Sequence, residues 1–150
     1  MGTPFNEVIE LGLIVMDDYK LNKLYETDQD QFVKYCDGLL IKAIPSFTVC
    51  RQSLEYVVDY NENPPIREFV NVLSIYEKDI LADYWVLQWF KKETQVASRI
   101  NAALQNSGSF RSHSEALNLK AKESYLDGLR VKVSQQSMDY LLMDLSSIDF

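Results

Sequence analysis

A length of 150 residues is typical of one domain, and 47% hydrophobic with 25% charged residues is an ordinary globular composition. The formal net charge of −7 argues against a general nucleic-acid-binding protein, because neutralising phosphates requires clustered Lys and Arg side chains. No apolar run approaches the roughly 18 residues that a membrane span needs. Glu7 and Glu10, without a basic region, do not fit a signal peptide.

The N-terminus is predicted to be helical. Thr3 is a suitable cap and Pro4 suits the first helical position, where its missing N–H costs nothing. Apolar residues then recur at helical spacing up to Met16, where two acidic residues end the pattern. Residues 19–25 are expected to form one further short turn.

A second helix is predicted to start at Thr27, which would cap it together with Asp30, and to bury one face. Pro45 should end or kink this helix, because proline disfavours helical geometry in the residue before it. Gly38 lies inside the pattern, where it either weakens the helix or marks close packing against another helix.

Residues 46–73 are ambiguous. The stretch 53–60 fits either a turn or two of helix or a strand, and 61–65 is a loop by composition. Residues 69–73 are expected to be an irregular apolar segment or a short strand that pairs with 55–59. A small β-hairpin beside the helical body is therefore one of the open alternatives.

Residues 74–92 are predicted to be the core helix. Ser74 and Glu77 form a capping box, in which each side chain bonds the other residue's backbone N–H. Trp85 and Trp89 lie four residues apart and therefore on one face. Apolar residues cover most of the circumference, which is typical of a helix surrounded by neighbours, and two lysines should close its C-terminal end.

Two more helices are expected after this core helix. Residues 94–104 predict about three turns, and the Asn-Ser-Gly-Ser of 106–109 breaks them. The last helix should run from Phe110 or Ser114 to Met143. About thirty helical residues span about 45 Å, which exceeds the body of a small domain. Part of this helix is therefore expected to pack on another subunit.

The expected fold is all-α, a helical bundle with a long C-terminal helix, in which residues 1–143 form the domain and 144–150 form an extended tail. The tail alternates loosely between apolar and polar residues, which suits addition to a sheet edge of a neighbour. A frayed terminus is the alternative. The predicted partner-binding residues are Leu142, Met143, Leu145, Ile148 and Phe150.

No motif carries catalytic or metal chemistry. His113 is the only histidine and has no recognised nucleophile motif beside it. Cys36 and Cys50 lack metal or redox spacing, which predicts free buried thiols. The acidic residues between 17 and 30 lack the mid-loop Gly and terminal Glu of a calcium loop. We therefore predict no enzymatic activity, no cofactor and no metal.

Three stretches carry a resemblance to a known family. They are the apolar helix 5–19, the helix end and Phe-x-x-Cys of 43–54, and the core helix 77–89, which 110–120 follows later. In this order they resemble small helical proteins encoded among the head–tail joining genes of tailed bacteriophages. The chain departs from that pattern after Trp89, where Lys-Lys-Glu-Thr replaces a more turn-like segment.

The resemblance implies a connector or adaptor without enzymatic activity. Such proteins form rings, commonly of twelve copies, and bridge the portal protein to the next neck or tail protein in the virion, after assembly in the bacterial host cytoplasm. DNA passes through the channel without specific binding, and an acidic surface suits that passage. The alternatives are a monomeric or dimeric helical adaptor or regulator that binds a protein partner, and an enzyme with an unfamiliar helical site.

Overall fold

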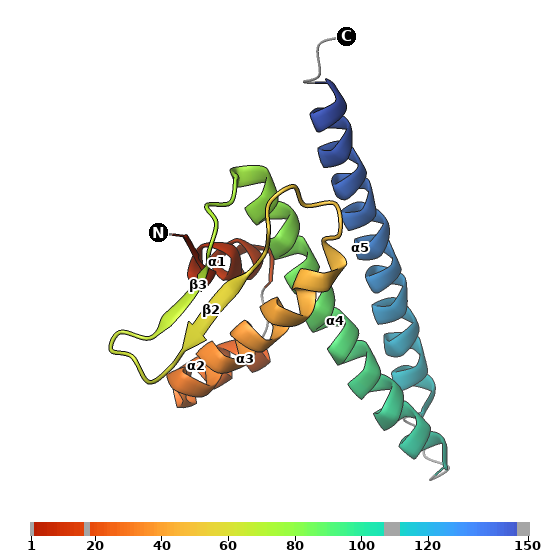
Figure 1. Cartoon of the computed structure of the whole chain (residues 1–150). Coiled ribbons are helices and arrows are strands. Elements are labelled where there is room, and N and C mark those ends of the chain that lie inside the picture. The colour runs from red at the N-terminus through yellow and green to blue at the C-terminus, as the bar shows by residue number, and fades with distance from the viewer. Residues whose placement is uncertain (1, 17–18, 107–111, 147–150) are drawn as a thin grey trace.

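The computed structural model of the chain describes residues 2–16, 19–106 and 112–146. The fold is mainly helical with one small antiparallel sheet, and Figure 1 shows the arrangement. The elements in chain order are β1 (Thr3–Pro4), α1 (Phe5–Val15), α2 (Tyr19–Thr27), α3 (Gln29–Ala43), the 3₁₀ turn η1 (Ile44–Ser46), β2 (Tyr56–Asp59), β3 (Ile66–Phe69), α4 (Ile75–Asn106) and α5 (Ser112–Ser146).

The sheet has the strand order β1-β3-β2, with antiparallel neighbours. Tyr56 pairs with Phe69 at one end of the hairpin, and Asp59 pairs with Ile66 at the other. The hairpin that the sequence left open is therefore present. Its second strand ends at Phe69, so only the first residue of the apolar stretch 69–73 belongs to it.

Helix α4 is the centre of the fold, as predicted, because α1, α3 and α5 all pack on it. Trp85 and Trp89 are both buried. Trp85 donates its indole N–H to the carbonyl of Cys36 at 3.0 Å, which ties α4 to α3. A Cβ atom on Gly12 would lie 2.5 Å from the Trp85 ring, so this glycine lets α1 approach α4 closely.

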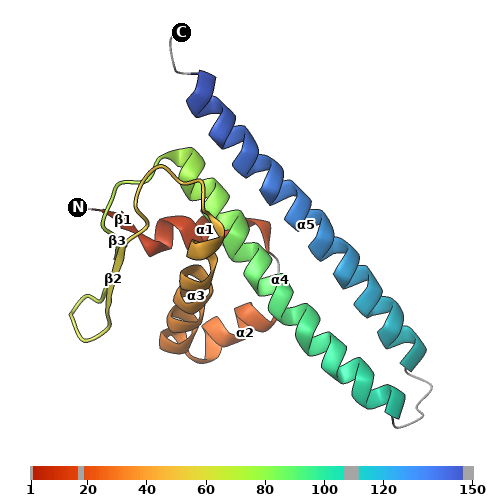
Figure 2. The same ribbon diagram turned by 45° about the vertical axis from the view of Figure 1, so that its right-hand side comes forward.

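Helices α4 and α5 form a long antiparallel pair (Figures 1 and 2). The second half of α4 and the first half of α5 project from the body that α1, α2, α3 and the sheet form around the start of α4. Among the described helices and strands, α5 packs on α4 alone. A 35-residue helix with a single helical neighbour leaves much of its surface uncovered.

Two boundaries of the core helix differ from the prediction. Residues 74–92 and 94–104 belong to one helix of 32 residues, α4. Lys91 and Lys92 therefore lie inside the helix and do not neutralise its C-terminal end. The reason is local, because no Gly or Pro interrupts the segment. The Thr94 hydroxyl bonds the Phe90 carbonyl at 2.8 Å and therefore does not cap a new helix.

The predicted caps of the N-terminal helices were also wrong. Thr3 lies in β1, where its hydroxyl accepts from Leu73 N–H at 2.8 Å and donates to the Asn71 carbonyl, so it fixes the entry to α4. Helix α3 is capped by Asp28, which accepts from the Gln31 N–H at 3.1 Å, while the Thr27 hydroxyl bonds carbonyls of α2. A full short helix, α2, replaces the expected single turn.

The predicted end of the last helix, at Met143, is three residues too early. Helix α5 continues to Ser146, so residues 144–146 are helical and do not begin an extended strand. Residues 147–150 lie outside the described residues.

Candidate functional site

A buried polar cluster fixes the C-terminal part of α5 against the body. Glu77 is almost fully buried and accepts four hydrogen bonds. Its Oε1 accepts from the Ser74 N–H and the Gln52 amide, both at 2.8 Å. Its Oε2 accepts from the Tyr140 hydroxyl at 2.8 Å and from the Cys50 thiol at 3.4 Å. The predicted capping box is present, because the Glu77 N–H also donates to the Ser74 hydroxyl.

Tyr140 is the residue through which α5 joins this cluster. Its hydroxyl also accepts from the Arg51 N–H at 3.1 Å, and the Arg51 guanidinium lies over its ring and bonds its carbonyl. The residues that follow Tyr140 are consequently held at a defined place at the edge of the body.

The Glu77 carboxylate is expected to make stability fall in mild acid. Burial raises its pKa, but the hydrogen bonds from Ser74, Tyr140 and Gln52 outweigh burial and hold the pKa below its usual value. A lowered folded-state pKa adds stability above the unfolded-state value of about 4.3, and that stability is lost as pH falls through the folded-state value. The measurement is urea unfolding of wild type and Glu77→Gln between pH 7 and pH 3. The wild type should lose its advantage over the variant in acid, whereas a pH-independent difference would contradict this role.

The outer face of α5 is apolar where it turns away from α4. The outer face of α5 is defined here by Val131, Met138 and Leu142, which are 70%, 51% and 53% exposed. At about 100° per residue they lie opposite Val133 and Tyr140, which are buried against the rest of the protein. A shallow cavity of about 330 Å³ lies on this face around Val131 and Met138. Helix α5 thus carries apolar residues on two sides, and those of the outer face are exposed in the single chain, among polar neighbours such as Ser134 and Gln135.

The predicted partner-binding residues are only partly placed by the structure. Leu142 belongs to the outer face, and Met143 beside it is 45% exposed. Leu145 lies in α5 at a position that continues the outer face, but its side chain is outside the described part of the chain. Ile148 and Phe150 also fall outside the described residues.

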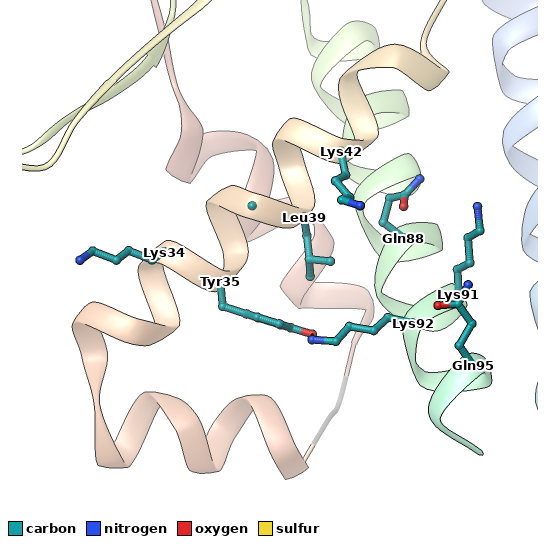
Figure 3. Close-up of a pocket in the computed structure, with 9 residues that line it drawn as sticks. Lys34, Tyr35, Leu39, Lys42, Gln88, Lys91, Lys92 and Gln95 are labelled. Carbon is teal, nitrogen blue, oxygen red and sulfur yellow. The ribbon is translucent and has the colours of Figure 1, made fainter. Parts of the chain in front are cut away.

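A second candidate site is a basic pocket that the sequence did not predict. The lysine pocket, as we name it, is a cavity of about 550 Å³ between α3 and α4 (Figure 3). Its lining residues are Lys34, Tyr35, Gly38, Leu39, Lys42, Gln88, Lys91, Lys92 and Gln95. None of them is acidic. Four of the 15 basic residues of an acidic chain therefore line one cavity.

The lysines of this pocket differ in the contacts that they form with other residues. Lys92 donates to the Tyr35 hydroxyl at 2.9 Å and lies 4.1 Å from its ring centroid. Lys34 lies over the Tyr60 ring, 5.3 Å from its centroid, and points away from the other lysines in Figure 3. Lys42 and Lys91 form no hydrogen bond or ion pair with another described residue.

Sequence reasoning missed this pocket because its residues come from helices about 50 positions apart. Lys34 and Lys42 are two turns apart on α3, and this spacing alone is typical of a solvated helix face. Only the packing of α3 on α4 brings them to Lys91 and Lys92.

The cysteines are free thiols. Burial, followed by the charge of Asp37, raises the pKa of Cys36 to about 12, and burial is also the main cause that raises the pKa of Cys50 to about 11. Both are therefore protonated and weakly nucleophilic at neutral pH.

The other residues considered for chemistry gain no new role. His113 lies in α5, with its side chain outside the described part, and Asp17 and Asp18 are not described. Within the described residues, no group of His, Cys, Asp and Glu side chains is arranged to hold a metal ion. In the same part of the chain, no helix combines the length and the apolar character of a membrane span.

Comparisons with protein-family models, curated proteins and solved structures gave no match to this chain.

Proposed function

We propose that this chain is a ring-forming connector or adaptor of a tailed-phage neck, which joins the portal to the next ring or to the tail. Its copies would pack into a helical ring, and DNA would pass through the channel of that ring. The resemblance implies a dodecamer. The observation that carries this proposal is the outer face of α5. An apolar face on a helix with one helical neighbour favours assembly over a monomeric adaptor.

The geometry supports lateral packing through α5 in particular. Val131, Met138 and Leu142 recur at spacings of seven and four, the pattern by which one helix packs along another. Tyr140 fixes this part of α5 to the Glu77 cluster, so the face is presented on a rigid element. Residues 147–150 are assigned in this proposal to contact with a neighbouring subunit or the next ring.

The test is the mass of the assembly in solution. Native mass spectrometry and sedimentation of the wild type should show a large homo-oligomer, and the double variant Met138→Glu, Leu142→Glu should reduce it to a folded monomer. Buried charge without a partner prevents association, whereas both positions are exposed in the single chain. Circular dichroism should show unchanged helix content.

Ile14→Glu is the matched control, because Ile14 is also an exposed apolar residue on a helix. It should leave the mass of the assembly unchanged. Deletion of residues 147–150 should keep the ring but remove binding to the neighbouring ring or portal. A wild-type chain that stays monomeric at every concentration would contradict the proposal and favour the adaptor alternative.

A further inference from the structure

We propose that the lysine pocket between α3 and α4 binds a phosphate-bearing ligand. This inference does not depend on the assembly through α5, because the pocket lies between α3 and α4, and α5 supplies none of its lining residues.

Positive charge is concentrated around the lysine pocket. Lys42, Lys91 and Lys92 come from two helices that the core holds together, so their backbone positions around the cavity are fixed. Like charges around one cavity repel, and none of the described residues that line it is acidic and could offset that repulsion. An anion in the cavity would remove the repulsion and gain charge-assisted hydrogen bonds.

Gly38 leaves a stretch of α3 without a side chain at the wall of the lysine pocket. This glycine lies inside α3, where glycine is less favourable than alanine, and a Cβ atom built on it would meet nothing within 4 Å. It therefore does not serve close helix packing, which the sequence had left open as its role. Gly38 lines the lysine pocket and leaves the backbone of α3 accessible from the cavity.

The chemistry of the lining favours phosphate. All four cations are lysines, which bind phosphate oxygens as point charges and donate up to three hydrogen bonds each. The amides of Gln88 and Gln95 add neutral hydrogen-bonding groups, and Leu39 supplies a buried apolar wall. A volume of about 550 Å³ lies within the usual range for small-ligand sites.

The phosphate could belong to a free nucleotide or to a nucleic-acid backbone. A backbone contact carries no sequence information, so it is compatible with DNA that passes a channel without specific binding. The two sources share the same recognition and differ in salt dependence, because each backbone phosphate that is neutralised releases counterions.

The test uses the full chain and three probes: inorganic phosphate, ATP and a short DNA duplex. Calorimetric titration at low salt should show binding of at least one probe by the wild type. Gly38→Glu should weaken that binding by about tenfold or more, the loss expected when a charge-assisted contact is removed. The new carboxylate would lie four residues from both Lys34 and Lys42 and compete with the ligand.

Gly38→Glu should raise the thermal stability of the protein while it weakens ligand binding. Replacing a helical glycine that has free space around it should raise the midpoint of thermal unfolding by about 2–4 °C. Gly38→Gln, of equal size and neutral, should keep most of the binding. Gly128→Glu on α5, where a new Cβ also meets nothing within 4 Å, should leave binding unchanged.

Two results support the inference and identify the source of the phosphate. Binding of phosphate or ATP that Gly38→Glu weakens indicates a free ligand. Binding of the duplex alone, with a salt slope near −0.9 per phosphate contacted and the same loss in Gly38→Glu, indicates a nucleic-acid backbone. The inference is overturned if no probe binds the wild type, or if binding persists in a folded Gly38→Glu protein.

Discussion

Trp85→Ala should remove most of the stability of this domain. The side chain is fully buried in the first half of α4, where Gly12 of α1 and Cys36 of α3 contact it. Truncation of a buried Trp costs about 3–5 kcal/mol, whereas domains of this kind are stable by only about 5–15 kcal/mol. The loss includes the indole hydrogen bond, which would leave the Cys36 carbonyl with one partner fewer.

Urea unfolding followed by far-UV circular dichroism measures this effect without relying on tryptophan fluorescence. Trp85→Phe is the matched control, because it keeps an aromatic ring and loses the N–H donor. It should cost clearly less than the Ala variant. A Trp85→Ala protein within about 1 kcal/mol of the wild type would mean that the core tolerates collapse around this position.

Features that depend on neighbours within one helical turn could be predicted from the sequence. The capping box of Ser74 and Glu77 is present, and Pro45 ends α3 as expected. The amphipathic spacing also identified the central helix and its two buried tryptophans. In each case the physical cause lies within a few residues along the chain, where sequence and spatial neighbourhood coincide.

Features that depend on which helix faces pack against each other could not be predicted from the sequence. Gly12 and Gly38 are both helical glycines, yet one lies against the Trp85 ring and the other opens into the lysine pocket. Glu77 was recognised as a cap, but its bond to Tyr140, 63 positions away, requires α5 to return along α4. The local pattern predicts caps at Thr3 and Thr27. In the structure, Thr3 bonds Leu73 instead, and the neighbouring Asp28 caps α3.

A buried ion pair fixes the hairpin to α3 and was not evident from the sequence. Asp37 is fully buried, and its carboxylate accepts two hydrogen bonds from Arg67 on β3, at 2.5 and 2.6 Å, and one from the Tyr60 hydroxyl at 2.8 Å. Arg67 also donates to the Asn6 side chain at 2.9 Å, so one guanidinium connects α3, β3 and α1. The signal available in the sequence was an Asp next to Cys36 on an otherwise apolar face.

Asp37→Ala is therefore expected to destabilise the protein by about 3–5 kcal/mol, the usual loss when one partner of a buried pair is removed. The Arg67 side chain is only 12% exposed, so the charge left behind is poorly solvated. The double variant Asp37→Leu, Arg67→Met should be closer to the wild type than Asp37→Ala is, because no unpaired charge remains. Urea unfolding of the wild type, Asp37→Ala, the double variant and its two single variants, Asp37→Leu and Arg67→Met, measures the difference. If the double variant were as unstable as the sum of its single variants, packing at these positions and not the unpaired charge would explain the loss.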